Sequence, residues 1–275
     1  MKFIKYQLFV CILAALSLGS QARTYSWKRT LMDGSRTGVT APGANNVTEA
    51  LGTVRGNIYI APSGKRFKGG VTPGVAAMLT GVQDDMARVK EVIAYAPRAM
   101  ERNAPECELS DWFIDVLMDA CRSKGRQVDV GITNFGGIRV DMPQGDVLLD
   151  DILSMFPFKN NLCYIRLKGK DLRKVLEGMA ADRFQIIGGM KCVAKDGKLV
   201  SALIDGKPIS DNKVYGLCTI SFLLNGGDGL SLARNAVELE IFDEYIIDVV
   251  LPAVRKLTAE GKPLEYHTDG RVTIL

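Results

Sequence analysis

Two glycine-rich segments of this chain place polar and charged side chains beside flexible backbone. The first reads Asn-Phe-Gly-Gly-Ile-Arg at residues 134–139 and directly follows a run of alternating apolar residues. The adjacent glycines Gly136 and Gly137 allow the backbone to approach a ligand closely or to adopt positive φ angles. The amide of Asn134 can donate and accept hydrogen bonds, and the guanidinium of Arg139 can hold a phosphate at two oxygens. The segment indicates either an anion-binding loop or a tight turn with a solvated arginine.

The second segment reads Phe-Leu-Leu-Asn-Gly-Gly-Asp-Gly at residues 222–229, where an aromatic residue again precedes a glycine-rich turn. Asp228 could accept hydrogen bonds from a ribose diol, although aspartate is also common in such turns for local backbone reasons. A further aromatic residue, Phe158, follows Pro157 in a polar stretch, where it has little reason to be buried. Two loop aromatics with an arginine and a carboxylate suit a nucleoside phosphate, because each base stacked on an aromatic ring contributes roughly 1–3 kcal/mol.

Hydrophobic periodicity predicts the elements that position these segments. The clearest helix covers residues 109–120, where Trp112 and Phe113 lie on the apolar face and are expected in the core. On the opposite face, Asp111, Asp115 and Asp119 are expected to be solvated.

Strands, further helices and turns follow from the same patterns. Strands are expected at residues 90–96, 128–132, 162–167 and 214–220, helices at 149–156, at 172–179 and from about Asp243 onward, and Asp-Gly turns at 196–197 and 205–206. Because strands and helices mix without a strict βαβ repeat, we expect an α/β or α+β fold with a mixed β-sheet and packed helices in layers.

The glycine-rich segments and the Pro-Phe pair, taken in order, resemble the C-terminal domain of the 5'-nucleotidase family. That family carries an Asn-x-Gly-Gly-Ile-Arg motif, then Pro-Phe, then Phe-x-x-Asn-Gly-Gly-Asp-Gly. The similarity extends from about Val92 to the C-terminus, where Asp-Gly-Arg-Val at residues 269–272 is similar to the family's closing strand. Residues 185–189 match more loosely a segment that lines the family's pocket. The resemblance implies a 5'-nucleotidase C-terminal domain-like fold.

The resemblance also implies a role for each matching residue. Phe158 and Phe222 would hold the nucleobase between their rings, and Asp228 would bind the ribose hydroxyls. Asn134 and Arg139 would orient the substrate and bind its phosphate. The loop that presents the second aromatic and the aspartate would be shaped by Asn225, Gly226 and Gly227. Upstream, the family supplies a further phosphate-binding arginine, but residues 102–107 of this chain offer no secure match.

Composition limits the chemistry that this chain can perform. Lys and Arg exceed Asp and Glu by only 35 − 31 = 4, so no clustered basic face for nucleic acid is indicated. His267 is the only histidine, whereas a two-metal hydrolytic site takes several His, Asp and Asn ligands. We therefore expect no catalytic residue, no bound metal and no cofactor in this chain. Divalent metals are expected only in a partner metallophosphoesterase chain.

Two functions remain open from the sequence. In one, the chain is the nucleotide- or nucleoside-recognition half of a 5'-nucleotidase-type hydrolase and acts in nucleotide catabolism with a separate metallophosphoesterase chain. In the other, it is a stand-alone nucleoside- or nucleotide-binding module without a catalytic role.

The N-terminus predicts export. Residues 1–22 combine a cationic start, an apolar run of eleven residues from Leu8 to Leu18 and small residues at a cleavage site, which is typical of a signal peptide rather than of a core helix. The apolar run is too short to span a bilayer with about 30 Å of hydrocarbon, so no membrane span is expected. We predict a periplasmic or extracellular protein, with residues 23–90 as an N-terminal extension or small subdomain and residues 91–275 as the nucleotide-binding domain.

Five cysteines follow the predicted signal peptide. We expect most of them to be buried thiols, and one disulfide is possible, although the sequence does not assign its pairing.

Overall fold

The computed structural model describes residues 34–43 and 45–275. The predicted signal peptide, residues 1–22, lies outside this part of the chain. The chain divides into two compact units between Gly81 and Val82. The boundary expected from the sequence, between residues 90 and 91, lies within the second unit.

Within residues 34–43 and 45–81, the first unit contains a small antiparallel sheet and two helices. Strands β1 (Thr53–Arg55), β2 (Ile58–Ile60) and β3 (Arg66–Lys68) pair in that order, helix α2 (Val47–Leu51) precedes them, and helix α3 (Thr72–Gly81) follows them. Tyr59, Ala61 and Ala76 form its buried core. Pro73 lies in the first turn of α3, where a missing backbone N–H costs no helical hydrogen bond.

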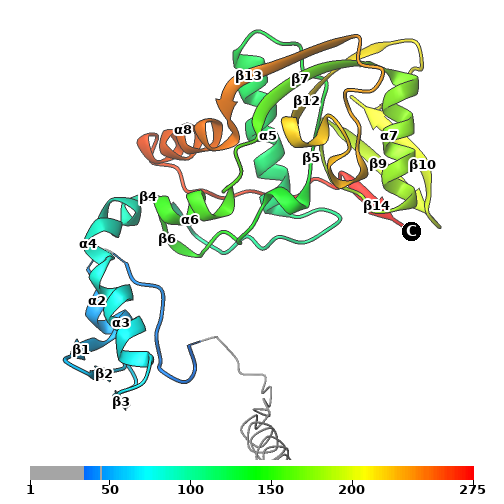
Figure 1. The fold of residues 1–275 in the computed structure, drawn as a ribbon. Coiled ribbons are helices and arrows are strands. Elements are labelled where there is room, and N and C mark those ends of the chain that lie inside the picture. Colours follow the sequence, from blue (N-terminus) through cyan, green and yellow to red (C-terminus); the bar gives the residue numbers. More distant parts are fainter. Residues whose placement is uncertain (1–33, 44) are drawn as a thin grey trace, which may run out of the picture. The chain divides into compact units, whose positions relative to one another are not determined.

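The second unit is built around a five-stranded mixed sheet (Figure 1). Its strands are β13 (Glu238–Tyr245), β7 (Asn161–Lys168), β12 (Val214–Ile220), β5 (Val130–Thr133) and β8 (Ile186–Gly188), in that spatial order. β12 and β5 run parallel, and every other neighbouring pair is antiparallel. The mixed sheet with packed helices confirms the predicted fold class.

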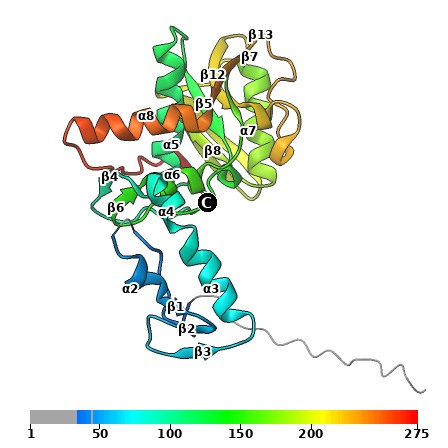
Figure 2. The same ribbon diagram turned by 60° about the vertical axis from the view of Figure 1, so that its left-hand side comes forward.

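Helices α5 (Glu108–Ser123) and α7 (Gly169–Ala181) lie on opposite faces of this sheet (Figure 2). Two glycines in the sheet let α5 approach closely. A Cβ atom on Gly131 would lie 2.8 Å from the side chain of Ile114, and one on Gly188 would lie 2.6 Å from the sulfur of Met118. Both distances are too short for a carbon contact, so a larger residue in either strand would push the helix away.

The apolar face of α5 forms the core as predicted. Trp112 and Phe113 are buried, and the ring centroid of Phe113 lies 4.4 Å from that of Phe156. Aromatic pairs at this spacing contribute packing beyond the area that they bury. The prediction that both α5 aromatics belong to the core is confirmed.

A second sheet has the order β11-β10-β9-β14 and includes the C-terminal strand. Its strands are β9 (Met190–Lys195), β10 (Lys198–Ile204), β11 (Lys207–Pro208) and β14 (Val272–Ile274). Asp196 and Gly197, with φ angles of 48° and 72°, join β9 to β10. Two successive positive φ angles are the signature of a type I′ hairpin turn, which confirms the predicted Asp-Gly turn.

The other elements of the second unit complete its layers. They are α4 (Gln83–Met86), η1 (Ala87–Lys90), β4 (Val92–Ala96), η2 (Phe135–Gly137), β6 (Gly145–Leu148), α6 (Leu149–Met155), η3 (Ser221–Leu223), η4 (Gly227–Gly229) and α8 (Ile246–Ala259). The expected helix start near Asp243 is wrong, because β13 continues through Tyr245. The carboxylate of Asp248 accepts the backbone N–H of Tyr245 at 3.0 Å and so caps α8. Pro252 lies inside this helix without ending it.

Arg271, immediately before β14, is buried against three carboxylates. Its Nη1 and Nη2 atoms donate to the two carboxylate oxygens of Asp115 at 3.0 and 2.7 Å. Its Nε atom lies 3.5 Å from Asp111 Oδ2 and 3.3 Å from Asp269 Oδ1. The expectation of a solvated side chain is therefore wrong for Asp111, which is buried, whereas Asp115 stays partly exposed and pairs with Arg271, because the C-terminal segment passes beside this face of α5. Asp119 does remain exposed and pairs with Arg122 at the surface.

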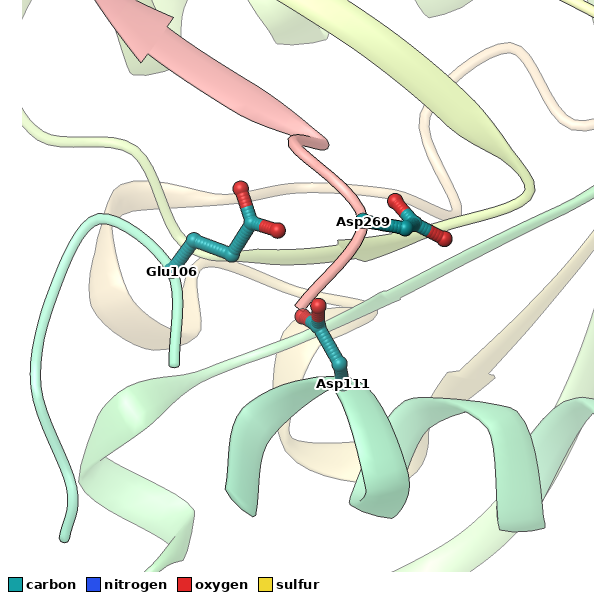
Figure 3. A group of neighbouring side chains, drawn as sticks. All are labelled: Glu106, Asp111 and Asp269. Carbon is teal, nitrogen blue, oxygen red and sulfur yellow. The ribbon is translucent and has the colours of Figure 1, made fainter. Parts of the chain in front are cut away.

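Glu106, Asp111 and Asp269 bring three carboxyl groups together (Figure 3), and Arg271 lies beside two of them. The backbone N–H groups of Gly270 and Val272 donate to Glu106 at 2.8 and 3.0 Å. Although burial opposes them, these donors hold the pKa of Glu106 below its ordinary value. Burial raises the pKa of Asp111 to about 8, and neighbouring Glu106 adds to the rise, against the pull of Arg271. Asp111 Oδ2 has no hydrogen-bond partner among the described residues. Of the three carboxyl groups, Asp111 is therefore the one that we expect to be protonated.

As pH rises from about 4 to about 8, the free energy of unfolding is expected to fall less for the variant Asp111→Asn than for the parent protein. A carboxyl group whose pKa rises from 3.8 to about 8 on folding binds more protons in the folded chain. The free energy of unfolding therefore falls as pH increases between these values, by up to about 1.4 kcal/mol per pH unit. Asparagine keeps the shape and cannot titrate.

Urea unfolding of the parent and of Asp111→Asn at several pH values in this window measures the difference. Asp119→Asn is the matched control, because Asp119 lies on the same helix with an exposed side chain. Parallel profiles for the parent and Asp111→Asn would contradict the assignment of the proton.

Candidate functional site

The strand directions of the five-stranded sheet bring the glycine-rich segments and the Pro-Phe pair to one end of it. β5 and β12 are parallel, with Leu217 opposite Val130, so residues 134–139 and 222–229 both begin where these strands finish. β7 is antiparallel to β12, with Leu162 opposite Ile220, so the Phe158 segment enters the sheet at this same end. We call this the motif end of the sheet. Ligand sites in open α/β sheets commonly form at such strand ends.

Asn134 joins the two glycine-rich segments directly. Its side chain is buried, and Nδ2 donates to Asp228 Oδ2 at 2.7 Å. A Cβ atom on Gly136 would lie 3.1 Å from Asn134 Nδ2 and 3.4 Å from Asp228 Oδ2, and one on Gly137 would lie 3.1 Å from Asn134 Oδ1. The two glycines thus leave room for this hydrogen bond.

The other oxygen of this amide has no protein partner. Asn134 Oδ1 is buried without a hydrogen bond among the described residues. A buried acceptor without a partner costs about 1–3 kcal/mol, which a donor on a bound molecule could offset. The amide therefore combines a structural contact with free acceptor capacity.

The second segment presents an aromatic ring and a carboxylate at the surface. Phe222, in η3, is 45% exposed. A Cβ atom on Gly227 would lie 2.7 Å from the ring atom Cδ1 of Phe222 and 2.2 Å from its carbonyl oxygen, so only glycine fits beneath this ring. Asp228 is exposed at φ 47°, and Gly226 at φ 104° precedes the turn. Asn225 lies exposed in the same loop.

Phe158 and Arg139 lie side by side at the motif end. Phe158 is 46% exposed, and the guanidinium carbon of Arg139 lies 5.6 Å from its ring centroid. At this spacing the cation is attracted to the aromatic ring. The Arg139 Nη1 atom also approaches the carbonyl oxygen of Gly136 at 3.4 Å. A stacking surface and a positive charge are therefore neighbours.

A hydrogen bond ties the two aromatic segments to each other. The backbone N–H of Asn161 donates to Ser221 Oγ at 3.0 Å. Phe222 directly follows Ser221, and Phe158 lies shortly before Asn161 in the chain. The structure thus brings the residues singled out from the sequence to one end of the sheet, with Asn134 and Ser221 as the linking side chains.

Arg102 and Gln185, which received no individual role from the sequence, also contact the first segment. Arg102 Nη1 donates to the carbonyl oxygen of Ile138 at 2.7 Å, and the backbone N–H of Arg102 donates to Asp141 Oδ1 at 2.7 Å. Gln185, which is buried, accepts the backbone N–H of Phe135 at 3.1 Å. The looser resemblance of residues 185–189 to a pocket-lining segment pointed to Gln185, whereas residues 102–107, which include Arg102, gave no secure match to the family's arginine.

Within the described part of the chain, no helix combines the length and apolar character needed to cross a bilayer.

The sequence is similar to one known domain family and to proteins from several organisms. The family model for the 5'-nucleotidase C-terminal domain matches residues 86–234. Protein UshA from Yersinia enterocolitica is 34% identical over 144 residues, which are 47% of this chain and 26% of that protein. Apyrase from Tabanus yao is 26% identical over 215 residues, which are 67% of this chain and 38% of that protein.

A solved structure adds agreement in fold. The crystal structure of a 5'-nucleotidase precursor from Thermus thermophilus matches with a TM-score of 0.65 and 22% sequence identity, covering 74% of this chain and 43% of that one. This chain thus spans about a quarter of the UshA protein and less than half of the solved nucleotidase. The family model nevertheless covers more than half of the 275 residues, and the chain therefore belongs to the 5'-nucleotidase C-terminal domain family.

Proposed function

We propose that this chain binds a nucleotide or nucleoside at the motif end of the five-stranded sheet. The base stacks between Phe158 and Phe222, the ribose hydroxyls bind Asp228, and the phosphate lies toward Arg139. The observation that carries the proposal is the 2.7 Å hydrogen bond between Asn134 and Asp228. This bond holds the carboxylate of Asp228 against the segment at residues 134–139. The half-exposed rings of Phe158 and Phe222 belong to the same end of the sheet.

Calorimetric titration of the chain with AMP and with adenosine, in the presence of a metal chelator, tests this proposal. Saturable binding of both ligands is expected, because every proposed contact comes from a side chain of this chain. Absence of binding at millimolar ligand would contradict a self-sufficient recognition site.

Hydrolysis requires groups that we assign to another chain. Residues that could hold a metal in the described part of the chain are Glu106, Asp111 and Asp269. They do not suit a catalytic cation, because the guanidinium of Arg271 already lies within 3.5 Å of Asp111 and Asp269. These residues therefore support no metal-dependent step.

We propose that the chain acts in nucleotide catabolism beside a separate metallophosphoesterase chain, which would supply the divalent metals. This proposal is supported by membership of the 5'-nucleotidase C-terminal domain family and by the single histidine, because a two-metal hydrolytic site takes several His, Asp and Asn ligands. Its test is a phosphate-release assay with AMP. A metallophosphoesterase chain encoded nearby is expected to gain activity when this chain is added. Unchanged activity together with calorimetric binding of AMP would favour a stand-alone binding module instead.

Arg139→Ala is expected to weaken AMP binding about 10- to 100-fold and to leave adenosine binding nearly unchanged. Adenosine has no phosphate, and hydrogen bonds to charged groups contribute about 1.5–3 kcal/mol. Calorimetry with both ligands measures the two effects, and Arg122→Ala serves as a control because Arg122 lies on α5 in a surface pair with Asp119. Equal losses for AMP and adenosine would remove Arg139 from the phosphate site.

We further propose that residues 1–22 direct export, so that the mature protein acts in the periplasm or outside the cell. N-terminal sequencing of the protein recovered from an exported fraction tests this, with a new terminus near Arg23 as the expected result.

A further inference from the structure

Two of the five cysteines in the described chain have their sulfur atoms in contact. Cys121 lies near the end of α5, and Cys218 lies in the central strand β12. The thiol of Cys121 donates to the sulfur of Cys218 across 3.3 Å, and both side chains are fully buried. Sulfur atoms in a disulfide are about 2.05 Å apart, so a further approach of about 1.3 Å would join them.

The other three thiols have different surroundings. Cys163 is the nearest competitor, but its thiol donates to the carbonyl oxygen of Asn161 at 3.5 Å. Cys107 caps α5 and accepts the backbone N–H of Ser110 at 3.4 Å. Cys192 lies in β9 of the second sheet. Contact between sulfur atoms thus selects one pairing from those that the sequence left open.

We propose that Cys121 and Cys218 form a disulfide bond in the exported protein. The proposal rests on the export proposed above, because disulfides form and persist in oxidising compartments. It fixes α5 to the central strand whose end presents Phe222. It also closes a loop of 97 residues, which restricts the unfolded chain.

The oxidant is the disulfide of a thiol–disulfide oxidoreductase or of oxidised glutathione. The thiolate of one cysteine attacks that disulfide, forms a mixed disulfide and releases one thiol of the oxidant. The thiolate of the second cysteine then attacks the mixed disulfide and releases the other thiol. The chain loses two electrons and two protons, and the oxidant gains both.

Burial decides when this reaction can occur. The attacking species is the thiolate, and burial, together with neighbouring Cys121, raises the pKa of Cys218 well above its ordinary value. The folded, reduced protein therefore holds almost no thiolate at this position, and no path for an oxidant is open to a fully buried pair. The bond must form during folding, before α5 covers β12.

Refolding of the full chain tests the pairing independently of export and of ligand binding. The denatured, reduced chain is refolded with a mixture of oxidised and reduced glutathione, then denatured, alkylated and digested for mass spectrometry. A peptide linking Cys121 to Cys218 is expected, with 6 − 2 = 4 of the six cysteines alkylated. The protein folded under reducing conditions and then exposed to oxidised glutathione is expected to give six alkylated cysteines.

Two variants separate this bond from its neighbours. Cys121→Ala is expected to remove the linked peptide, whereas Cys163→Ala, which changes the adjacent thiol, is expected to keep it. Four alkylated cysteines with another pairing, or six after oxidative refolding, would overturn the proposal. So would a bond that forms on refolding but is missing from correctly processed protein recovered from an exported fraction. A failure of the chain to bind AMP would contradict only the proposed function and would leave the disulfide proposal unchanged.

Discussion

Replacing Arg271 with alanine is expected to lower the free energy of unfolding by about 3–5 kcal/mol. Arg271 is 5% exposed and donates two hydrogen bonds to Asp115, with Asp111 and Asp269 also within 3.5 Å of its Nε atom. Its removal leaves the partly buried carboxylate of Asp115 without its counter-ion, beside the buried side chain of Asp111. The energy lost is mainly the cost of that unpaired charge, and it exceeds the net contribution of an intact ion pair.

Urea unfolding of Arg271→Ala beside Arg255→Ala measures this effect. Arg255 forms a similar two-fold contact with Glu91 at 2.9 Å, but both side chains are about half exposed. Solvent screens an exposed pair and leaves it with little net effect on stability, so the control is expected to stay close to the parent. Similar small losses for both variants would show that the buried carboxylates rearrange or take up protons without cost.

Replacing Phe222 with alanine is expected to weaken the binding of AMP and adenosine alike, by about 5- to 150-fold. Stacking of a base on an aromatic side chain contributes roughly 1–3 kcal/mol, and every 1.4 kcal/mol changes the dissociation constant tenfold. The effect is the same for both ligands because the base is common to them. Calorimetry with both ligands, under the conditions used for Arg139→Ala, separates stacking from phosphate binding.

Gly227→Ala examines the same ring without removing it. A Cβ atom at this position would lie 2.7 Å from the ring of Phe222, so the ring must move and binding is expected to weaken for both ligands. Gly125→Ala is a control, because a Cβ atom on Gly125 meets nothing within 4 Å, although its φ of 78° adds local strain. Unchanged affinity in both Phe222→Ala and Gly227→Ala would place the base elsewhere.

The sequence by itself determined the features that depend on local chemistry. The apolar repeat of α5 predicted Trp112 and Phe113 in the core, because a helix places residues three and four apart on one face. The pair Asp196-Gly197 predicted a hairpin, because a type I′ turn needs two residues that tolerate positive φ. The two glycine-rich segments with the Pro-Phe pair between them, taken in order, were enough to indicate the family.

Only the tertiary structure decided which groups meet across long separations. Asp111 and Asp115 share a polar helix face. The periodicity of the helix cannot tell whether this face contacts solvent or, as here, a buried arginine that lies 156 residues after Asp115 in the chain. The contact of Arg102 with Ile138 and the hydrogen bond from Asn134 to Asp228 depend likewise on how the strands are ordered. Spacing along the chain fixes which side chains share a face, whereas strand order and direction fix what that face contacts, because residues distant in sequence become neighbours only when the sheet forms.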